Sequence, residues 1–207
     1  MDARPVEVGI LRVCSYCSRF SPSFFVCQNK ITIAKSAVVC KGCVLKGNIS
    51  IGAGTVIHPG CQILALGGPI QIGANNLIEE QVSIINSPNA NQGTGQVTLI
   101  GSNNSFAVGC TVESVAVGDG NVVEPKAHLK VGTLIPNGCT IGAAVILDPT
   151  EVLEDGTTVW GLEHNRRIDA NGQKKNTHAL KPRLTMLHKI LPSSHKLIGA
   201  AKAASAP

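Results

Sequence analysis

The sequence predicts an all-β solenoid of about seven coils, followed by a C-terminal α-helix. The main observation is an aliphatic residue at every sixth position in two long stretches of the chain. The positions of these two series all hold Val, Ile or Leu: Ile33, Val39, Leu45, Ile51, Ile57 and Ile63, then Val117, Val123, Leu129, Ile135, Ile141, Leu147, Leu153 and Val159. A period of six belongs neither to an α-helix nor to a lone strand, but it is typical of short strands repeated around a solenoid. Aromatic residues make up only 3% of the chain, so small aliphatic side chains must fill the core.

Longer spacings give the length of one coil. Ile33 and Ile51 are 18 residues apart, and the same interval is 21 from Ile51 to Ile72, 28 from Ile72 to Ile100 and 17 from Ile100 to Val117. One coil therefore contains three hexads, and the chain carries insertions of three and ten residues and a deletion of one. Seven coils stacked at about 4.8 Å make a prism roughly 34 Å tall.

The fifth position of each hexad is expected near an inner corner of the prism, where only small side chains fit. Four of the eight cysteines occupy it: Cys43, Cys61, Cys110 and Cys139. A thiol buried there behaves as a small hydrophobe. The pairs Cys14-x-x-Cys17 and Cys40-x-x-Cys43 have the internal spacing of a zinc site, which is the alternative interpretation. Because Cys43 already fits the core and disulfides are not required, we expect no metal and a reducing compartment.

Asparagine occupies this fifth position in three successive coils, at Asn76, Asn104 and Asn121. These residues should therefore lie above one another. We expect a structural ladder in which each side-chain amide hydrogen-bonds to the next and is satisfied inside the core.

The repeat resembles that of the hexapeptide-repeat family. The shared features are the aliphatic first position, the small fifth position and a glycine after the aliphatic residue, as at Gly52, Gly73, Gly101, Gly118 and Gly142. The resemblance implies a left-handed parallel β-helix, a hand opposite to the usual crossover rule. It also implies two classes of enzyme. Acyltransferases of this family use a histidine base between neighbouring subunits, and its carbonic-anhydrase relatives bind zinc through three histidines.

Two histidines within the repeats, His58 and His128, are the candidates for a catalytic base. They are 70 residues apart, and no two histidines have the His-x4-His spacing of the zinc-binding relatives. We therefore favour surface histidines without a catalytic role. A hexapeptide-repeat acyltransferase or carbonic-anhydrase-like metalloenzyme remains the alternative function.

The positive charge of the chain is concentrated in its tail. Residues 1–160 hold nine Lys and Arg against eleven Asp and Glu, whereas residues 161–207 hold nine against two. There is no dense basic run with interleaved aromatics, so we expect an acidic protein partner and no nucleic acid. No apolar stretch approaches the roughly 20 residues of a membrane span, so none is expected.

The tail predicts one amphipathic helix. Pro182 suits its first position and Pro192 should end it. Leu184, Leu187 and Leu191 share one side at spacings of three and four, so this side should dock along the prism. The other side carries a basic set that we expect to face a partner: Arg183, His188 and Lys189.

Longer stretches resemble the dynactin subunit six family. They are "VIHPGCQILALGGPIQIGANNLIEEQVSIIN", "IGSNNSFAVGC", "VGDGNVVEPKAHL", "NGCTIGAAVIL" and "MLHKILPSSHKL", in one order from about Ile31 to Lys196. The resemblance implies a non-enzymatic scaffold subunit of the dynactin pointed-end complex, in the cytoplasm on the cytoskeleton, supporting dynein-driven transport and cargo selection. It implies contact with a companion β-helical subunit and the pointed-end actin-related protein, and not a homotrimer. It brings no catalytic, cofactor-binding or metal-binding residues.

The expected organisation has three parts. Residues 1–30 show no hexad register and are expected to be a poorly ordered extension. Residues 31–162 form the hexapeptide-repeat β-helix, and residues 163–207 form a basic linker and the helical tail.

Overall fold

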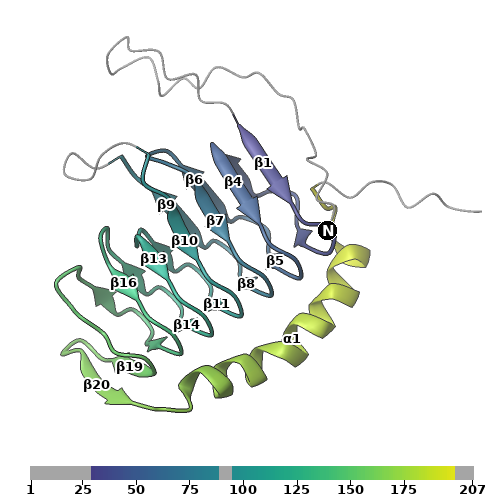
Figure 1. Ribbon diagram of the computed structural model, residues 1–207. Helices are drawn as coiled ribbons and strands as arrows, with labels where there is room; N and C mark the ends of the chain where they lie inside the picture. The colour runs from purple at the N-terminus through teal and green to yellow at the C-terminus, as the bar shows by residue number, and fades with distance from the viewer. Residues whose placement is uncertain (1–28, 89–94, 199–207) are drawn as a thin grey trace, which may run out of the picture.

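The computed structural model describes residues 29–88 and 95–198. They form a three-sided stack of short strands with one long helix along it (Figure 1). Six coils each give one strand to each of three sheets, and a partial seventh coil ends the stack. The predicted solenoid of about seven coils with a C-terminal helix is therefore confirmed. Residues 1–28, which make up most of the expected extension, lie outside the described residues.

Face A is a six-stranded parallel sheet. Its strands are β1 (Lys30–Ile33), β4 (Asn48–Ile51), β7 (Ile70–Ile72), β10 (Thr98–Ile100), β13 (Ala116–Val117) and β16 (Leu134–Ile135). Its pairing aligns the predicted aliphatic series Ile33, Ile51, Ile72, Ile100, Val117 and Ile135.

Face B has eight strands. They are β2 (Val38–Val39), β5 (Val56–Ile57), β8 (Leu77–Ile78), β11 (Ser105–Phe106), β14 (Val122–Val123), β17 (Thr140–Ile141), β19 (Thr157–Trp160) and β20 (Asn165–Ile168). All its pairs are parallel except the last, in which β20 runs antiparallel to β19.

Face C completes the prism with six parallel strands. They are β3 (Val44–Lys46), β6 (Gln62–Ala65), β9 (Ser83–Asn86), β12 (Thr111–Val112), β15 (His128–Leu129) and β18 (Ile146–Leu147). The two insertions leave the stack after β6 and after β9, both at the end of a face C strand. The pairing on either side therefore keeps its register.

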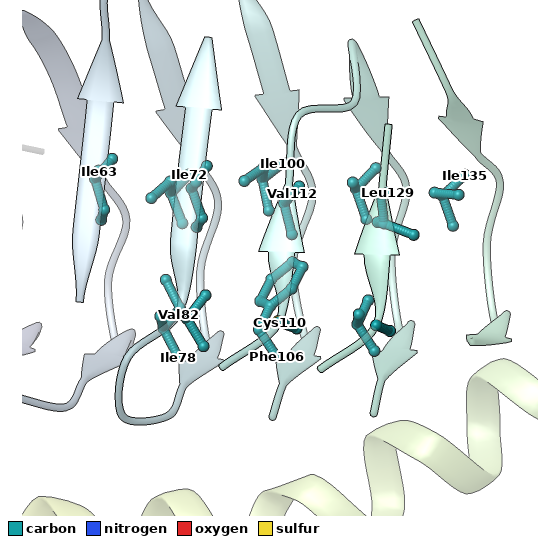
Figure 2. Close-up of a cluster of buried hydrophobic side chains, with 14 of the residues drawn as sticks. Ile63, Ile72, Ile78, Val82, Ile100, Phe106, Cys110, Val112, Leu129 and Ile135 are labelled. Carbon is teal, nitrogen blue, oxygen red and sulfur yellow. The ribbon is translucent and has the colours of Figure 1, made fainter. Parts of the chain in front are cut away.

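The core is the interior of the prism, filled by the inward residues of all three faces. Figure 2 shows side chains from successive coils, such as Ile72 and Ile100, stacked one after another. Phe106 is the largest fully buried side chain. Cys61, Cys110 and Cys139 are buried in the same cluster, and Cys43 packs against it. The prediction that these cysteines act as core residues agrees with this arrangement.

Some corners require the absence of a side chain. A Cβ atom at Gly73 would lie 2.6 Å from the carbonyl oxygen of Gly101, one coil further on. Any other residue would therefore push two coils apart, which explains why glycine follows the inward aliphatic residue at this corner.

The helix α1 (Gly172–Ser194) begins ten residues before the predicted start. Pro182 and Pro192 lie inside it, so the predicted limits at these prolines were wrong. An internal proline costs about 3 kcal/mol because it removes one backbone hydrogen bond. Burial of Leu180 offsets this cost. Leu180 lies one turn before Leu184 and extends the apolar side of the helix toward its N-terminus. No helix among the described residues is long and apolar enough to cross a membrane.

The helix lies along the outside of face B (Figure 1). Leu180, Leu184 and Leu191 are buried against an apolar patch of its first coils, and Leu187 packs there partly buried. The patch consists of Val38, Cys40, Val56 and Leu77. A helix of 23 residues is about 34 Å long, which equals the height of seven coils.

Both ends of α1 are fixed to the prism. At the start, Asn176 donates a hydrogen bond from Nδ2 to the carbonyl oxygen of Gly120 at 3.0 Å. After the helix, the backbone N–H of Lys41 donates to the carbonyl of Lys196, and that of Ile198 donates to Val39, each at 2.7 Å. The chain thus returns from the last coil to the first.

Replacing Leu184 and Leu187 with aspartate should destabilise the protein. Placing carboxylates against face B removes the apolar contact, and we expect a loss of at least about 3 kcal/mol. At about 2–4 °C per kcal/mol for a chain of this size, the melting temperature should fall by roughly 6–12 °C. Differential scanning calorimetry would measure it.

The matched control is the double replacement of Met186 and Ile190, which are exposed on the same helix. Aspartate at these positions should change the melting temperature by less than about 2 °C. Equal shifts for both pairs would show that docking of the helix does not contribute to stability.

Candidate functional site

The asparagine column lies inside the prism, and all three side chains are fully buried. Oδ1 of Asn76 accepts from the backbone N–H of Asn104 at 2.8 Å, and Oδ1 of Asn104 accepts from that of Asn121 at 2.8 Å. Oδ1 of Asn121 continues the column to the backbone N–H of Cys139 at 2.7 Å. The stacking matches the prediction, but the bonds run from side chain to backbone and not from amide to amide.

The nitrogen ends of the column differ from one another. Nδ2 of Asn76 donates to the carbonyl of Gly101 at 2.8 Å. Nδ2 of Asn104 and Nδ2 of Asn121 are buried without a hydrogen-bond partner among the described residues. The prediction that every amide is satisfied was therefore wrong for these two nitrogens.

The predicted basic set on α1 does not face outward as a unit. Arg183 pairs with Glu79 on face B, and Nε2 of His188 lies 3.0 Å from the carbonyl oxygen of Gly54. Lys189 alone of the three is exposed without such a contact. The first two residues therefore help hold the helix on the prism, which differs from the expectation that all three meet a partner.

Other lysines supply the outward charge of the helix. Lys174, Lys181 and Lys189 are all exposed along α1. The sequence prediction missed the first two because it began the helix at Pro182. The signal that could have found them is Leu180, four residues before Leu184 on the same stripe.

The two candidate bases lie three coils apart, His58 after β5 and His128 in β15. Nδ1 of His58 is 2.6 Å from Glu80, and Nε2 of His128 is 2.9 Å from Glu113. His164, just after the last coil, pairs with Glu151 at 2.9 Å. The structure therefore gives each histidine a carboxylate partner of its own and does not bring these histidines together.

Burial raises the pKa of Glu80, but the hydrogen bond with His58, a backbone hydrogen bond and the nearby His58 and His195 together outweigh it and hold the pKa below its ordinary value. The carboxylate is therefore stabilised in the folded protein. The His58–Glu80 pair lies at the surface of the prism, where the Glu80 side chain is about half exposed to solvent.

No histidine lines either of two hollows in the described part of the prism. The smaller lies beside the second insertion and is lined by Asn86, Gln96, Thr98, Ser114 and neighbouring residues. The larger is a shallow groove of about 590 Å³ on the outside of face A. Glu113 is the one ionisable residue in the lining of the smaller hollow, and its carboxylate is hydrogen-bonded to His128. The lining of the larger groove contains no ionisable residue that could act as a general base.

The cysteines among the described residues are free thiols. Burial raises the pKa of Cys40 to about 11 and that of Cys110 to about 12, so these thiols stay protonated. Residues 29–88 and 95–198 contain no group of side chains that could hold a metal ion. Cys14 and Cys17, the other half of the zinc alternative, lie outside this part of the chain.

Replacing Asn76 with leucine should destabilise the protein more than replacing Asn104. Leucine at position 76 leaves both the Asn104 N–H and the Gly101 carbonyl without their partner. Each buried group left unpaired costs about 1–3 kcal/mol. Leucine at position 104 leaves one N–H unpaired but also removes an unpaired amide, so its cost should be smaller. Urea unfolding would measure both, and Asn48→Leu, at an exposed position, is the control. Equal stability of Asn76→Leu and the wild type would contradict the role of the column.

The Glu80 carboxyl should make stability depend on pH. Its pKa is lower in the folded state, so its contribution is complete above the unfolded pKa of about 4.3 and is lost as pH falls through the folded pKa. From pH 6 to pH 3 the wild type should therefore lose more unfolding free energy than Glu80→Gln. Urea titrations at each pH would test this, with the exposed Glu163→Gln as the control. Parallel curves for the wild type and Glu80→Gln would contradict it.

Solved structures similar to this chain share its fold. A Bacillus cereus protein assigned as an acetyltransferase has a TM-score of 0.66 and 15% identity, over 78% of this chain and 92% of that protein. A hexapeptide transferase family protein from Anaplasma phagocytophilum has a TM-score of 0.66 and 13% identity, over 78% and 93%. At such identities the likeness shows the fold alone, the left-handed parallel β-helix of hexapeptide-repeat proteins.

Curated relatives are much closer in sequence. Dynactin subunit 6 of Danio rerio is 38% identical over 186 residues, which are 87% of this chain and 93% of the relative. The Xenopus tropicalis and Nematostella vectensis proteins of that name are 38% and 39% identical, over 86% and 81% of this chain and 89% and 92% of theirs. No family model matches the sequence. The similarity to these relatives extends over nearly their whole length, and the chain therefore belongs to the dynactin subunit 6 family.

Proposed function

We propose that this chain is a non-catalytic scaffold subunit of dynactin, in the cytoplasm on the cytoskeleton. The observation that carries the proposal is the similarity to proteins named dynactin subunit 6 over 81–87% of the chain. Such a match is long enough to include both the β-helix and the tail. In this proposal, the described coils of the β-helix supply rigid contact surfaces, and the tail folds back along them as far as residue 198.

The arrangement of the histidines supports a role without catalysis. His58 and His128 lie three coils apart, each pairs with its own glutamate, and neither lines the two hollows described above. The acetyltransferase-like structures share only 13–15% identity with this chain, so they give no support for a shared reaction.

The proposed partners are those of the pointed-end complex. The chain would contact a companion β-helical subunit and the pointed-end actin-related protein, and would support dynein-driven transport and cargo selection. The exposed lysines of α1 are a surface suited to an acidic protein, since they extend along the prism on one side.

Affinity purification of the tagged full chain from its own cells tests the proposal. Mass spectrometry should identify the companion β-helical subunit and the pointed-end actin-related protein among the recovered proteins. Sedimentation should show the chain in a large complex. A chain recovered as a homotrimer without any dynactin component would contradict the scaffold function.

A further inference from the structure

Two of the core cysteines occupy the same place in neighbouring coils. Strand β3 pairs in parallel with β6 and aligns Val44 with Gln62. Cys43 and Cys61 directly precede these residues, so they are stacked in the first two coils. Neighbouring coils are about 4.8 Å apart. This spacing lies within the range of about 4.4–6.8 Å that separates the Cα atoms of a disulfide.

Both sulfur atoms face a backbone carbonyl of the next coil. Sγ of Cys43 lies 3.0 Å from the carbonyl oxygen of His58, and Sγ of Cys61 lies 2.9 Å from that of Glu79. A bond between the two sulfurs would require the Cys61 side chain to turn about its Cα–Cβ bond. Cys40, the other member of the C-x-x-C pair, packs instead in the apolar patch under α1. The stacked Cys61 is therefore better placed to react with Cys43 than Cys40 is.

Cys43 is also the most open of the described cysteines. It is partly buried in the first coil, whereas the others are all buried: Cys40, Cys61, Cys110 and Cys139. A Cβ atom on the preceding Gly42 would meet no described atom within 4 Å. The corner beside Cys43 is therefore open enough for a small oxidant to approach.

The surroundings favour the thiolate of Cys43. A hydrogen bond from the Cys61 thiol lowers the pKa of Cys43 below its ordinary value. The same hydrogen bond and burial raise the pKa of Cys61, so the proton stays on Cys61. Residues 29–78 contain no Asp or Glu, and they carry exposed lysines near Cys43 at Lys41 and Lys46. A partly exposed thiol in positive surroundings is typical of a reactive cysteine.

We propose that Cys43 and Cys61 form a reversible disulfide with hydrogen peroxide as the oxidant, Cys43 being the attacking thiol and Cys61 the resolving one. Redox-sensitive cysteines are often accessible and lie next to such a resolving cysteine. The inference goes beyond the proposed function and does not depend on it.

The reaction has two steps. The Cys43 thiolate attacks one peroxide oxygen, the O–O bond breaks, and the leaving hydroxide takes up a proton to give water, with sulfenic acid left on Cys43. The Cys61 sulfur then attacks the Cys43 sulfur, whose S–O bond breaks, and the Cys61 proton leaves with the hydroxyl group as water. The two thiols are oxidised to a disulfide while the peroxide is reduced to water. Exchange with a small-molecule thiol would reverse the bond.

The disulfide would fasten the first coil, which has a neighbouring coil on one side only. It would join residues 18 positions apart and so limit the opening of this coil. Backbone amides of residues 30–46 should therefore exchange with deuterium more slowly in the oxidised protein than in the reduced protein.

Peptide mapping of the full chain tests the inference. The reduced protein would be treated with hydrogen peroxide, its remaining thiols blocked with N-ethylmaleimide, and its digest analysed by mass spectrometry without reduction. The main linked peptide should connect Cys43 with Cys61, and dithiothreitol should restore both thiols. Cys43 should react at least about tenfold faster than Cys110, which is buried.

Two alanine variants separate the roles of the cysteines. In Cys61→Ala the reaction should stop at sulfenic acid on Cys43, which dimedone would trap. Alanine already occupies the same corner at Ala127, so the fold should accept it. The matched control is Cys110→Ala, at the same corner two coils further on, which should form the Cys43–Cys61 link as the wild type does.

Several outcomes would overturn the inference. They are a main link from Cys43 to Cys40 or to a cysteine of residues 1–28, a Cys43 thiol that stays reduced while Cys110 is oxidised, and a Cys43–Cys61 link that forms only in urea. Melting temperatures of the reduced variants would show whether they are folded. The map of the wild type decides the inference even if a variant unfolds.

Discussion

Everything in this protein depends on backbone pairing between one coil and the next. Many strands contain only two residues, such as β2 and β17, and none of them has a partner within its own coil. A coil is therefore stable only between two others, and its side chains must align with theirs. This constraint explains the underlying period of eighteen residues. It also explains why both insertions leave the prism after face C strands, where extra residues pass outward without shifting the register.

The same constraint creates the need for the tail. The first and last coils each lack one neighbour and leave backbone edges unpaired. The β20 strand closes face B at one end, and residues 196–198 close it at the other. Since these two segments lie at opposite ends of α1, the helix length must match the height of the stack. The leucine stripe, the Arg183–Glu79 pair and the Asn176 bond hold the helix along the way.

The sequence predicted the coils because their signal is local and repeated. The aligned residues Ile33, Ile51 and Ile72 were placed correctly from spacing alone, including the insertion. The start of α1 was not predicted, because Pro182 is a local signal for the first turn of a helix and the docking that extends the helix involves residues more than 100 positions away. The pairing of His58 with Glu80 could have been found, since the two are one coil, three inserted residues and one position apart. The hydrogen-bond partners of Asn104 could not have been predicted. Side-chain amide groups and backbone N–H groups compete as donors for the same asparagine side-chain oxygen.

The different charges on the three faces also bear on whether identical chains could form a three-fold ring. Subunits of a three-fold ring meet through two different patches, because a cyclic contact other than a dimer is heterologous. With face B covered by α1, the remaining choice would place face A, whose strands carry no charged residue except Lys30, against face C. That contact would place the His128–Glu113 pair and Lys46 against a surface with few charges. Lys46 would then lose hydration without gaining a partner of opposite charge. Within the proposed function, a partner with a surface unlike face C would therefore match face A better than a second copy of this chain.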